Sequence, residues 1–387
     1  MKKKVFLLFI VIGLLAGVLA ACGTASDGSE KAHDTNISEQ LTFDHSETLA
    51  YAQKFSIDDY NDGYALVTIT DGSRYLVVPD GKEAPDDLAS DIVVIQKPVQ
   101  NIYIAASAVM DMFVSLDALD DIRFSSLKAD GWYIDAAKEA MENGDILYAG
   151  KYSTPDYEQI VQENCGLAIE NTMILHTPEV KEQLEKFGIH VLVDYSSYET
   201  EPLGRTEWVK LYGLLTGHEE EADAAFEKEQ AAFEDVKNNV SDSDDQETKT
   251  VAFFYITSNG QANVRKSADY LPKMIEMAGG KYVFDDLGDE EDATSTMSMQ
   301  MEEFYAGAKD ADYIIYNSTI EGELDSVDDL LAKSPLFEKF KAVQEGHVYC
   351  TSRNLYQSTM ELGTITSDIH RMLIGDDEDL TYLYQLK

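Results

Sequence analysis

The chain has 387 residues, which is long enough for two domains of common size. Its 72 acidic residues far outnumber its 30 basic residues, and the formal net charge is −42. Because a field of that sign opposes binding to nucleic acid and to anionic lipid headgroups, we expect no nucleic-acid partner, and a tether rather than surface charge must hold the chain at a membrane.

The N-terminus has the pattern of a secretory signal. Lys2 to Lys4 precede the mostly apolar run Val5 to Ala21, which is short for a membrane span of about 20 apolar residues. The tetrapeptide Leu19 to Cys22 resembles the lipobox of bacterial lipoproteins, in which the cysteine is cleaved free and diacylated. We therefore expect residues 1–21 to be a signal peptide and Cys22 to be a lipid anchor on the outer face of the cytoplasmic membrane. The alternatives are an ordinary signal peptide, or a membrane helix, with an incidental cysteine.

Residues 22–40 are polar and aperiodic, which predicts a flexible tether behind the lipid. Two alternating β-rich runs then surround Asp71-Gly72 within Tyr64 to Pro79, a strong hairpin signal. The prediction is a small β-hairpin appendage over residues 41–90.

From Asp91 onward, short β-rich runs alternate with amphipathic helical segments, which is typical of α/β lobes. We assign residues 91–216 to an N-terminal α/β lobe and 241–387 to a C-terminal α/β lobe. Between them, residues 217–240 are strong helix formers with an apolar stripe that includes Phe226 and Phe233. The predicted fold is α/β, with two Rossmann-like lobes joined by this single long helix, which we interpret as a stiff connector. The alternative is a packed helix of a single domain.

The cysteines and histidines give little sign of chemistry. Cys165 and Cys350 lie far apart in apolar settings, which favours two buried free thiols over a disulfide framework. The seven histidines contain no close-spaced pair of the kind that builds a metal site. The chain also lacks the His-Glu-x-x-His, Gly-x-Ser-x-Gly and Walker-type motifs. The acidic run Gly288 to Ala293 lacks the spacing of an EF-hand loop and is interpreted as a solvated loop.

A family resemblance rests on one block. Tyr198 to Phe226 contains Glu-x-x-Pro-Leu-Gly-Arg-x-Glu-Trp and closely resembles class III substrate-binding proteins of ABC importers, which take up ferric siderophores, haem and cobalamin. The resemblance extends over roughly Asp91 to Ile374 and includes Met277 to Phe284 and Ser334 to Tyr349. It implies a monomeric receptor without catalytic activity or intrinsic cofactor, which captures a metal chelate and delivers it to an ABC permease with its ATPase.

The resemblance also implies docking residues. In the family, each lobe carries a surface glutamate at a helix start that meets arginines of the permease, and arginine binds carboxylate bidentately. The matching positions are Glu158 and Glu302, with Glu303 as the alternative in the second lobe because the spacing there is longer. Both places depart from the family pattern, since its usual Pro-Asp is replaced by Cys165-Gly166 and by Ala311-Asp312.

Open α/β sheets bind ligands beyond the carboxyl ends of their strands, so polar and aromatic residues after the predicted strands are candidate ligand contacts. Aromatic rings provide flat apolar walls for a macrocycle or chelate, and Arg and Lys can hold an anionic rim. The candidates are Ser107, Trp132, Tyr133, Lys151, Tyr152 and His176 in the first lobe and Arg265, Tyr270, Asn317, Arg353 and Tyr356 in the second. This set favours a ferric siderophore, haem or corrinoid. A tethered metal-ion-binding protein and a cell-surface hydrolase are the alternatives.

Overall fold

The computed structural model of the protein describes residues 36–242, 248–288 and 296–387. The predicted signal peptide, the predicted lipid anchor Cys22 and most of the predicted tether lie outside these ranges. Among the described residues, a search for helices long and apolar enough to cross a bilayer finds none.

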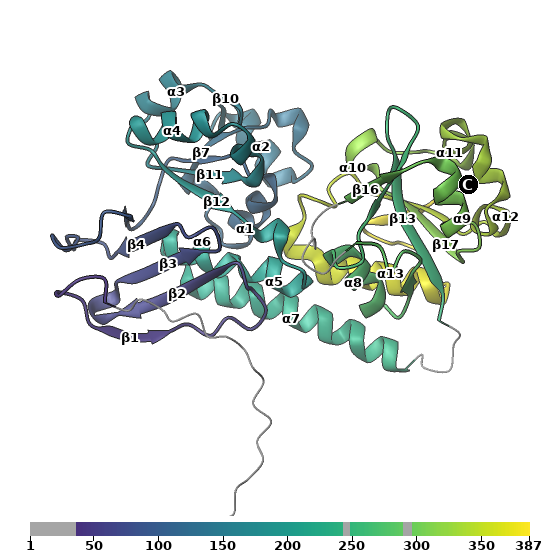
Figure 1. The fold of residues 1–387 in the computed structure, drawn as a ribbon, viewed down its shortest axis with the longest axis horizontal. Helices are drawn as coiled ribbons and strands as arrows, with labels where there is room; N and C mark the ends of the chain where they lie inside the picture. Colours follow the sequence, from purple (N-terminus) through teal and green to yellow (C-terminus); the bar gives the residue numbers. More distant parts are fainter. Residues whose placement is uncertain (1–35, 243–247, 289–295) are drawn as a thin grey trace, which may run out of the picture. The chain divides into compact units, whose positions relative to one another are not determined.

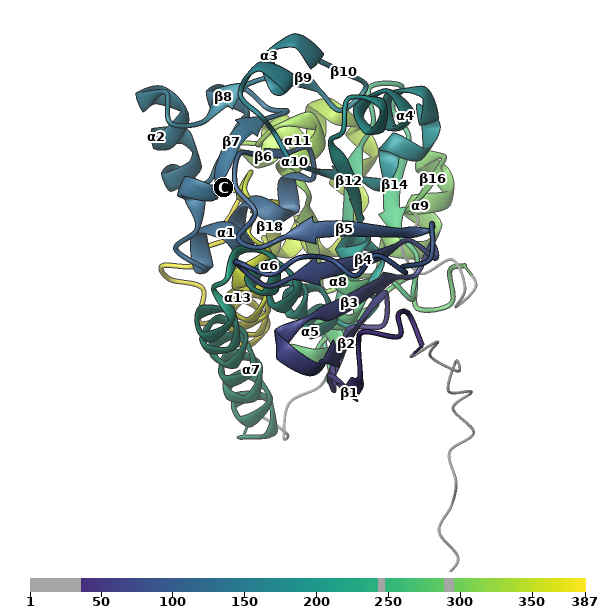
Figure 2. The same cartoon turned by 90° about the vertical axis from the view of Figure 1, so that its left-hand side faces the viewer.

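The N-terminal sheet has five strands in the order β1-β2-β3-β4-β5 (Figures 1 and 2). Its strands are β1 (Phe43–Ser46), β2 (Phe55–Tyr60), β3 (Ala65–Ile69), β4 (Arg74–Val78) and β5 (Ile92–Gln96). The hairpin expected around Asp71-Gly72 is present, because β3 and β4 pair antiparallel and Gly72 adopts a φ of 90° in the turn.

Two boundaries of this region differ from the prediction. We expected β5 to open the N-terminal lobe, but it pairs parallel with β4 and completes the N-terminal sheet. The β-rich run in the sequence predicts a strand, but it does not indicate which strand pairs with it. Residues 36–40, expected in the tether, pack on the sheet: Ile37 is buried, and Asp87 accepts hydrogen bonds from the Ser38 hydroxyl and the Glu39 N–H.

The N-terminal lobe is built on a five-stranded parallel sheet of order β12-β11-β6-β7-β8. Alternate residues of β11 enter different hydrophobic clusters, Leu167 and Ile169 one and Ala168 the other, so both faces of the sheet are covered. The strands are β6 (Ile102–Ile104), β7 (Ile122–Ser125), β8 (Leu147–Tyr148), β11 (Leu167–Asn171) and β12 (His190–Asp194). The helices are α1 (Met110–Ser115), α2 (Asp135–Asn143), α3 (Tyr157–Gln162) and α4 (Pro178–Lys186), and β9 (Gly150–Lys151) pairs with β10 (Thr154–Pro155).

The C-terminal lobe has a mixed sheet of order β16-β14-β13-β17-β18-β19, with β15 also paired to β13. Its strands β13, β17 and β18 are parallel, and β14, β16 and β19 are antiparallel additions. The strands are β13 (Thr250–Ile256), β14 (Ala262–Arg265), β15 (Lys281–Tyr282), β16 (Thr296–Met299), β17 (Tyr313–Tyr316), β18 (Val348–Thr351) and β19 (Leu383–Gln385). The helices are α8 (Tyr270–Met277), α9 (Met301–Ala308), α10 (Ser318–Glu321), α11 (Val327–Lys333), α12 (Lys341–Glu345) and α13 (Leu362–Ile374).

Three helices lead from one lobe to the other: α5 (Pro202–Glu207), α6 (Val209–Thr216) and α7 (Glu219–Asp242). Helix α7 begins with three glutamates, which favour the positive end of the helix dipole. The expected stripe residues Phe226 and Phe233 are buried, and α7 packs against both α6 and α13 (Figure 1). The predicted connecting segment is therefore helical, and it packs along its neighbours rather than spanning a gap alone.

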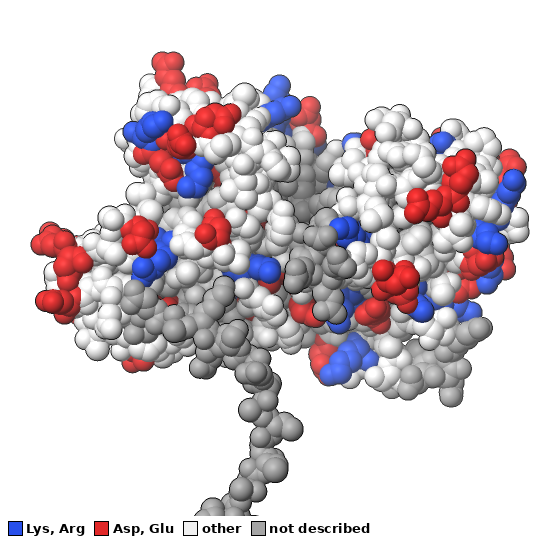
Figure 3. Space-filling model, in the orientation of Figure 1, with Lys and Arg blue, Asp and Glu red and all other residues white. Residues whose placement is uncertain are grey.

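One hydrophobic cluster extends over both lobes and the N-terminal sheet, beside smaller clusters within the N-terminal lobe and on the other face of the N-terminal sheet. A single cluster of buried residues runs from Ala52 through Ile104 and Phe226 to Leu386. On the face in Figure 3, charged side chains of both signs are spread over the surface of the two lobes. The fold is thus the two-lobed α/β architecture expected from the sequence, with a larger N-terminal sheet than expected.

Candidate ligand-binding pocket

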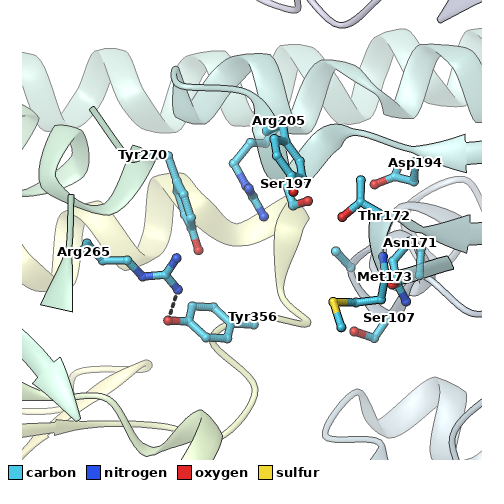
Figure 4. A pocket seen from close by; sticks show the side chains of 13 residues that line it. Ser107, Asn171, Thr172, Met173, Asp194, Ser197, Arg205, Arg265, Tyr270 and Tyr356 are labelled. Atoms are coloured by element: carbon cyan, nitrogen blue, oxygen red, sulfur yellow. Dashed lines mark hydrogen bonds between the residues drawn. The ribbon is translucent and has the colours of Figure 1, made fainter. Parts of the chain in front are cut away.

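A pocket of about 390 Å³ is lined by residues from both lobes. The N-terminal lobe contributes residues that follow β6, β11 and β12, at the carboxyl ends of parallel strands, where open α/β sheets bind ligands. Arg205 of α5 and three residues of the C-terminal lobe complete it (Figure 4). The full lining is Ala106, Ser107, Ala108, Asn171, Thr172, Met173, Asp194, Ser197, Tyr198, Arg205, Arg265, Tyr270 and Tyr356.

The wall from the N-terminal lobe is held in place by hydrogen bonds within its loops. The Asn171 amide donates to the Ala105 carbonyl at 2.9 Å and accepts from the Met173 N–H at 2.9 Å. Asp194 is buried, which raises the pKa of its carboxyl, and it accepts from the Ser196 hydroxyl and the Tyr212 hydroxyl, each at 2.6 Å. These polar groups are already satisfied, so they shape the pocket.

Arg205 is the least satisfied cation of the pocket. Its guanidinium carbon lies 4.0 Å from the centre of the Tyr270 ring, a cation–π contact. Only 6% of the residue surface is exposed, and Nε has no hydrogen-bond partner among the described residues. Nε itself is shielded from solvent, so a ligand would meet the terminal nitrogens of this guanidinium, which points into the pocket (Figure 4).

Arg265 faces the same pocket with partners of its own. It forms an ion pair with Asp269 at 3.2 Å and a hydrogen bond with the Tyr356 hydroxyl, shown as a dashed line in Figure 4. Asn317 donates to the same hydroxyl at 2.7 Å and holds Tyr356 from behind. Burial raises the pKa of Tyr270, so this phenol stays neutral at ordinary pH. The pocket therefore offers two guanidinium groups and, at Tyr270, a neutral phenol ring.

The structure brings together four of the eleven predicted ligand residues: Ser107, Arg265, Tyr270 and Tyr356 line the pocket. Asn317 does not line the pocket but donates a hydrogen bond to Tyr356, which does. Arg205 was not among the predicted ligand residues, although it lies in the Pro-Leu-Gly-Arg block, because it is inside a helix rather than at the end of a strand. Asn171 was not predicted either, although it directly follows the predicted strand Leu167 to Glu170 and is the last residue of β11.

The other predicted residues lie elsewhere. Trp132 is in the core, 2% exposed, where its indole N–H donates to the Ser125 hydroxyl at 3.0 Å; a tryptophan after a strand serves packing as readily as binding. Tyr133 and Arg353 contact each other across the lobes, with the guanidinium carbon 5.0 Å from the ring centre. The remaining three are Lys151 and Tyr152, at the turn between β9 and β10, and the exposed His176, and none of them lines this pocket.

The predicted docking glutamates are at the surface. Glu158 is exposed in the first turn of α3, and Glu302 and Glu303 are both exposed in the first turn of α9. Each lobe thus presents a carboxylate at a helix start, as the resemblance implies. Within the described ranges, no group of three or more His, Cys, Asp or Glu side chains has the arrangement of a metal site. Cys165 and Cys350 are buried free thiols, as expected.

Comparisons with known proteins bear on the family and the fold. Residues 106–355, more than half of the chain, match the family model described as "Periplasmic binding protein". An uncharacterized lipoprotein of Methanocaldococcus jannaschii, MJ0872, is 25% identical over 404 residues, with all of both chains covered.

Solved structures show the same fold. A periplasmic heme binding protein from Pseudomonas aeruginosa superposes with a TM-score of 0.58 at 15% identity, over 74% of this chain and 95% of that one. An ABC-type Fe3+-hydroxamate transport system protein from Saccharomonospora viridis gives a TM-score of 0.53 at 16% identity, over 71% and 93%. At these identities the likeness concerns the fold.

Proposed function

The chain belongs to the periplasmic binding protein family, and from this we propose that its pocket captures an anionic organic metal complex for import. Members of the family bind solutes and do not catalyse reactions, so the chain is the substrate-binding component of an ABC importer. The finer proposal concerns the ligand: a ferric siderophore, haem or corrinoid, bound without covalent change.

The observation that carries the proposal is the pair Arg205 and Arg265 at one cavity. Two guanidinium groups attract carboxylate, catecholate or other oxygen anions, and arginine binds such groups through paired hydrogen bonds. In a chain with a net charge of −42, Arg205 and Arg265 make this cavity less negative than the surface as a whole, although Asp194 also lines it and Asp269 is paired with Arg265. An anionic ligand is therefore repelled less at this cavity than elsewhere on the surface.

The rings beside the arginines favour a ligand with flat or apolar parts. Tyr270 and Tyr356 flank the guanidinium groups, and Met173 and Tyr198 line the pocket while 48% and 40% exposed. A complex larger than the 390 Å³ cavity would extend over these two exposed side chains. The names of solved neighbours, heme binding and Fe3+-hydroxamate transport, support the chelate class.

Delivery requires a membrane location and a permease. The family is periplasmic or extracellular, and two full-length or nearly full-length relatives carry the name lipoprotein. We propose that Cys22 is the lipid anchor and that Glu158 and Glu302, or Glu303 in place of the latter, meet the permease.

The test is a binding screen on the purified protein. Thermal shift is measured with haemin, cyanocobalamin, ferric citrate, a ferric hydroxamate and a ferric catecholate, with zinc and manganese salts as the bare-metal arms. A true ligand at 100 times its dissociation constant adds about 2.7 kcal/mol to the free energy of unfolding. We expect a shift with one chelate class and none with the bare ions. A response to zinc or manganese alone would overturn the proposed ligand class.

A further inference from the structure

The N-terminal sheet is joined to the pocket through helix α5. Residues 50–54, which lead into β2, lie along α5, and a Cβ atom on Gly204 would be only 3.0 Å from the Tyr51 carbonyl oxygen. A side chain at 204 would therefore require the two backbones to move apart by a few tenths of an ångström. All six residues of α5 are buried.

Two carboxylates hold this segment by its backbone. Glu207 accepts hydrogen bonds from the N–H groups of Ala50, Tyr51 and Ala52 at 2.7–2.8 Å. Glu199 accepts from the N–H groups of Gln53 and Lys54 at 2.9–3.0 Å, and from the Trp208 indole at 3.1 Å.

Five consecutive amides thus bond to two glutamates that are 1% and 2% exposed. Hydrogen bonds to an ionised acceptor are the strong ones, and losing such a partner inside a protein is costly. The segment is therefore fixed to α5 at the level of its backbone.

The same helix carries Arg205 toward the pocket. Glu207 and Arg205 are two positions apart, so their side chains leave the helix about 200° from each other. Glu207 faces residues 50–54, and Arg205 faces Tyr270 and the cavity. A helix of six residues has little stability of its own, so packing must fix its position. The helix packs on α7, α8 and α13, and on the side away from Arg205 the carboxylate of Glu207 adds three hydrogen bonds to the backbone of residues 50–52.

We propose that residues 50–54, with their acceptors Glu199 and Glu207, position Arg205 for ligand binding. The inference rests on the proposed function, because Arg205 is useful in this place only if the pocket takes an anion. It assigns a role to the segment that leads into the N-terminal sheet: this segment fixes the helix that carries a pocket arginine.

The test measures the accessibility of Arg205 without any ligand. The purified full chain is treated with phenylglyoxal, and modification of each arginine is followed by peptide mass spectrometry. Glu207→Gln keeps the size of the side chain but places an amide N–H against backbone N–H donors. We expect Arg205 to be modified at least threefold faster in Glu207→Gln than in the wild type, with Arg265 little changed.

The chain offers a matched control. Asp368 is also a buried carboxylate that accepts two consecutive backbone N–H groups, those of Thr381 at 2.8 Å and Tyr382 at 2.6 Å, but it does not line the pocket. Asp368→Asn should lower the melting temperature while leaving the rate at Arg205 unchanged. Equal rates at Arg205 in the two variants would overturn the positioning role.

A second variant decides the matter if Glu207→Gln does not fold. Gly204→Ala pushes on the Tyr51 carbonyl, whereas Gly166→Ala adds a Cβ atom with no neighbour within 4 Å and serves as its control. Faster modification of Arg205 in Gly204→Ala alone supports the proposal, and no difference between the two contradicts it. Silence of every chelate in the binding screen would remove the proposed function and leave this result standing.

Discussion

Arg205 and Arg265 line one pocket in different electrostatic settings. Arg265 neutralises Asp269, a carboxylate whose side chain is 2% exposed, whereas Nε of Arg205 has no partner among the described residues. Removing one member of a buried ion pair leaves the other charge uncompensated, which typically costs about 3–5 kcal/mol. The two arginines should therefore respond differently to the same substitution.

We expect Arg265→Ala to lower the free energy of unfolding by about 3 kcal/mol and to weaken ligand binding. Arg205→Ala should destabilise the protein less but lower the affinity for an anionic ligand by about 10- to 100-fold, the loss of one or two charge-assisted hydrogen bonds. Urea unfolding and ligand titration of both variants are the measurements. Equal losses of stability would show that Arg205 is also an essential structural cation.

Glu170 is a second residue whose environment is out of the ordinary. It lies on β11 with its side chain fully buried, and neither carboxyl oxygen has a hydrogen-bond partner among the described residues. Burial raises its pKa to about 8 from the ordinary value of 4.5. Between pH 4.5 and 8, the folded protein therefore keeps a proton on Glu170 that the unfolded chain has already released. Because the folded state binds more protons in this window, the free energy of unfolding falls as the pH rises through it.

Glu170→Met should remove that pH dependence. We expect the variant to be more stable than the wild type at pH 9, by about 2 kcal/mol or more, and close to it at pH 5, because an apolar side chain of similar size needs no desolvation. Chemical denaturation at pH 5, 7 and 9 measures the difference. A constant difference across the three values would mean that Glu170 does not titrate in this range.

At the scale of elements, helices α7 and α13 approach each other closely. A Cβ atom on Gly363 would lie 2.5 Å from the Ala232 Cβ, and Glu229 of α7 accepts a hydrogen bond from the Gly363 N–H at 3.0 Å. The connecting helix is thus joined to the C-terminal lobe by both packing and a buried carboxylate. Just before α13, the Met360 N–H donates a hydrogen bond to the carboxylate of Asp111 in α1 at 2.7 Å.

Gly363→Ala should lower the free energy of unfolding by about 1–3 kcal/mol, because an extra methyl group in a close-packed contact forces the helices apart. Gly166→Ala serves as the control here too and should change stability by less than about 0.5 kcal/mol. Thermal unfolding of both variants gives the comparison. A Gly363→Ala variant as stable as its control would mean that α7 and α13 can separate without loss.

Local sequence patterns could predict which segments form helices and strands, but not which elements contact each other. Short β-rich runs indicated β6, β11 and β13, because strands of a sheet covered on both faces are apolar throughout, and helical periodicity indicated α7, because it buries one apolar stripe. The same patterns could not place β5, since the choice between two sheet edges is made by tertiary contacts. The strand-end rule found Ser107 and Tyr356, but it could not separate Trp132, which packs inward, from a ligand residue. Arg205 could not be predicted as a pocket residue, because its place there depends on the tertiary contact with Tyr270 of α8.

At the scale of the whole molecule, the exposed glutamates of the two lobes make the importer assignment testable without a ligand. Reversing Glu158 and Glu302 to arginine should abolish uptake by cells, because like charges across an interface cost several kcal/mol, while ligand affinity stays within about twofold. The control reverses Glu139 and Glu338, two other exposed glutamates, with the same change of net charge. Normal uptake would call for Glu303→Arg as well, and normal uptake of that triple variant would remove the docking assignment.

The continuous cluster of buried residues has a consequence for how the protein loses its structure. Since Ala52, Ile104 and Leu386 belong to one core, neither lobe can melt without exposing apolar surface of the other. Calorimetry of the ligand-free protein should therefore record a single endotherm whose calorimetric and van't Hoff enthalpies agree. Two resolved endotherms would mean that the lobes are separate cooperative units.

Residues 102–216 produced as an isolated fragment should aggregate rather than fold, so engineering that exchanges one lobe for a relative's must redesign the shared core as well.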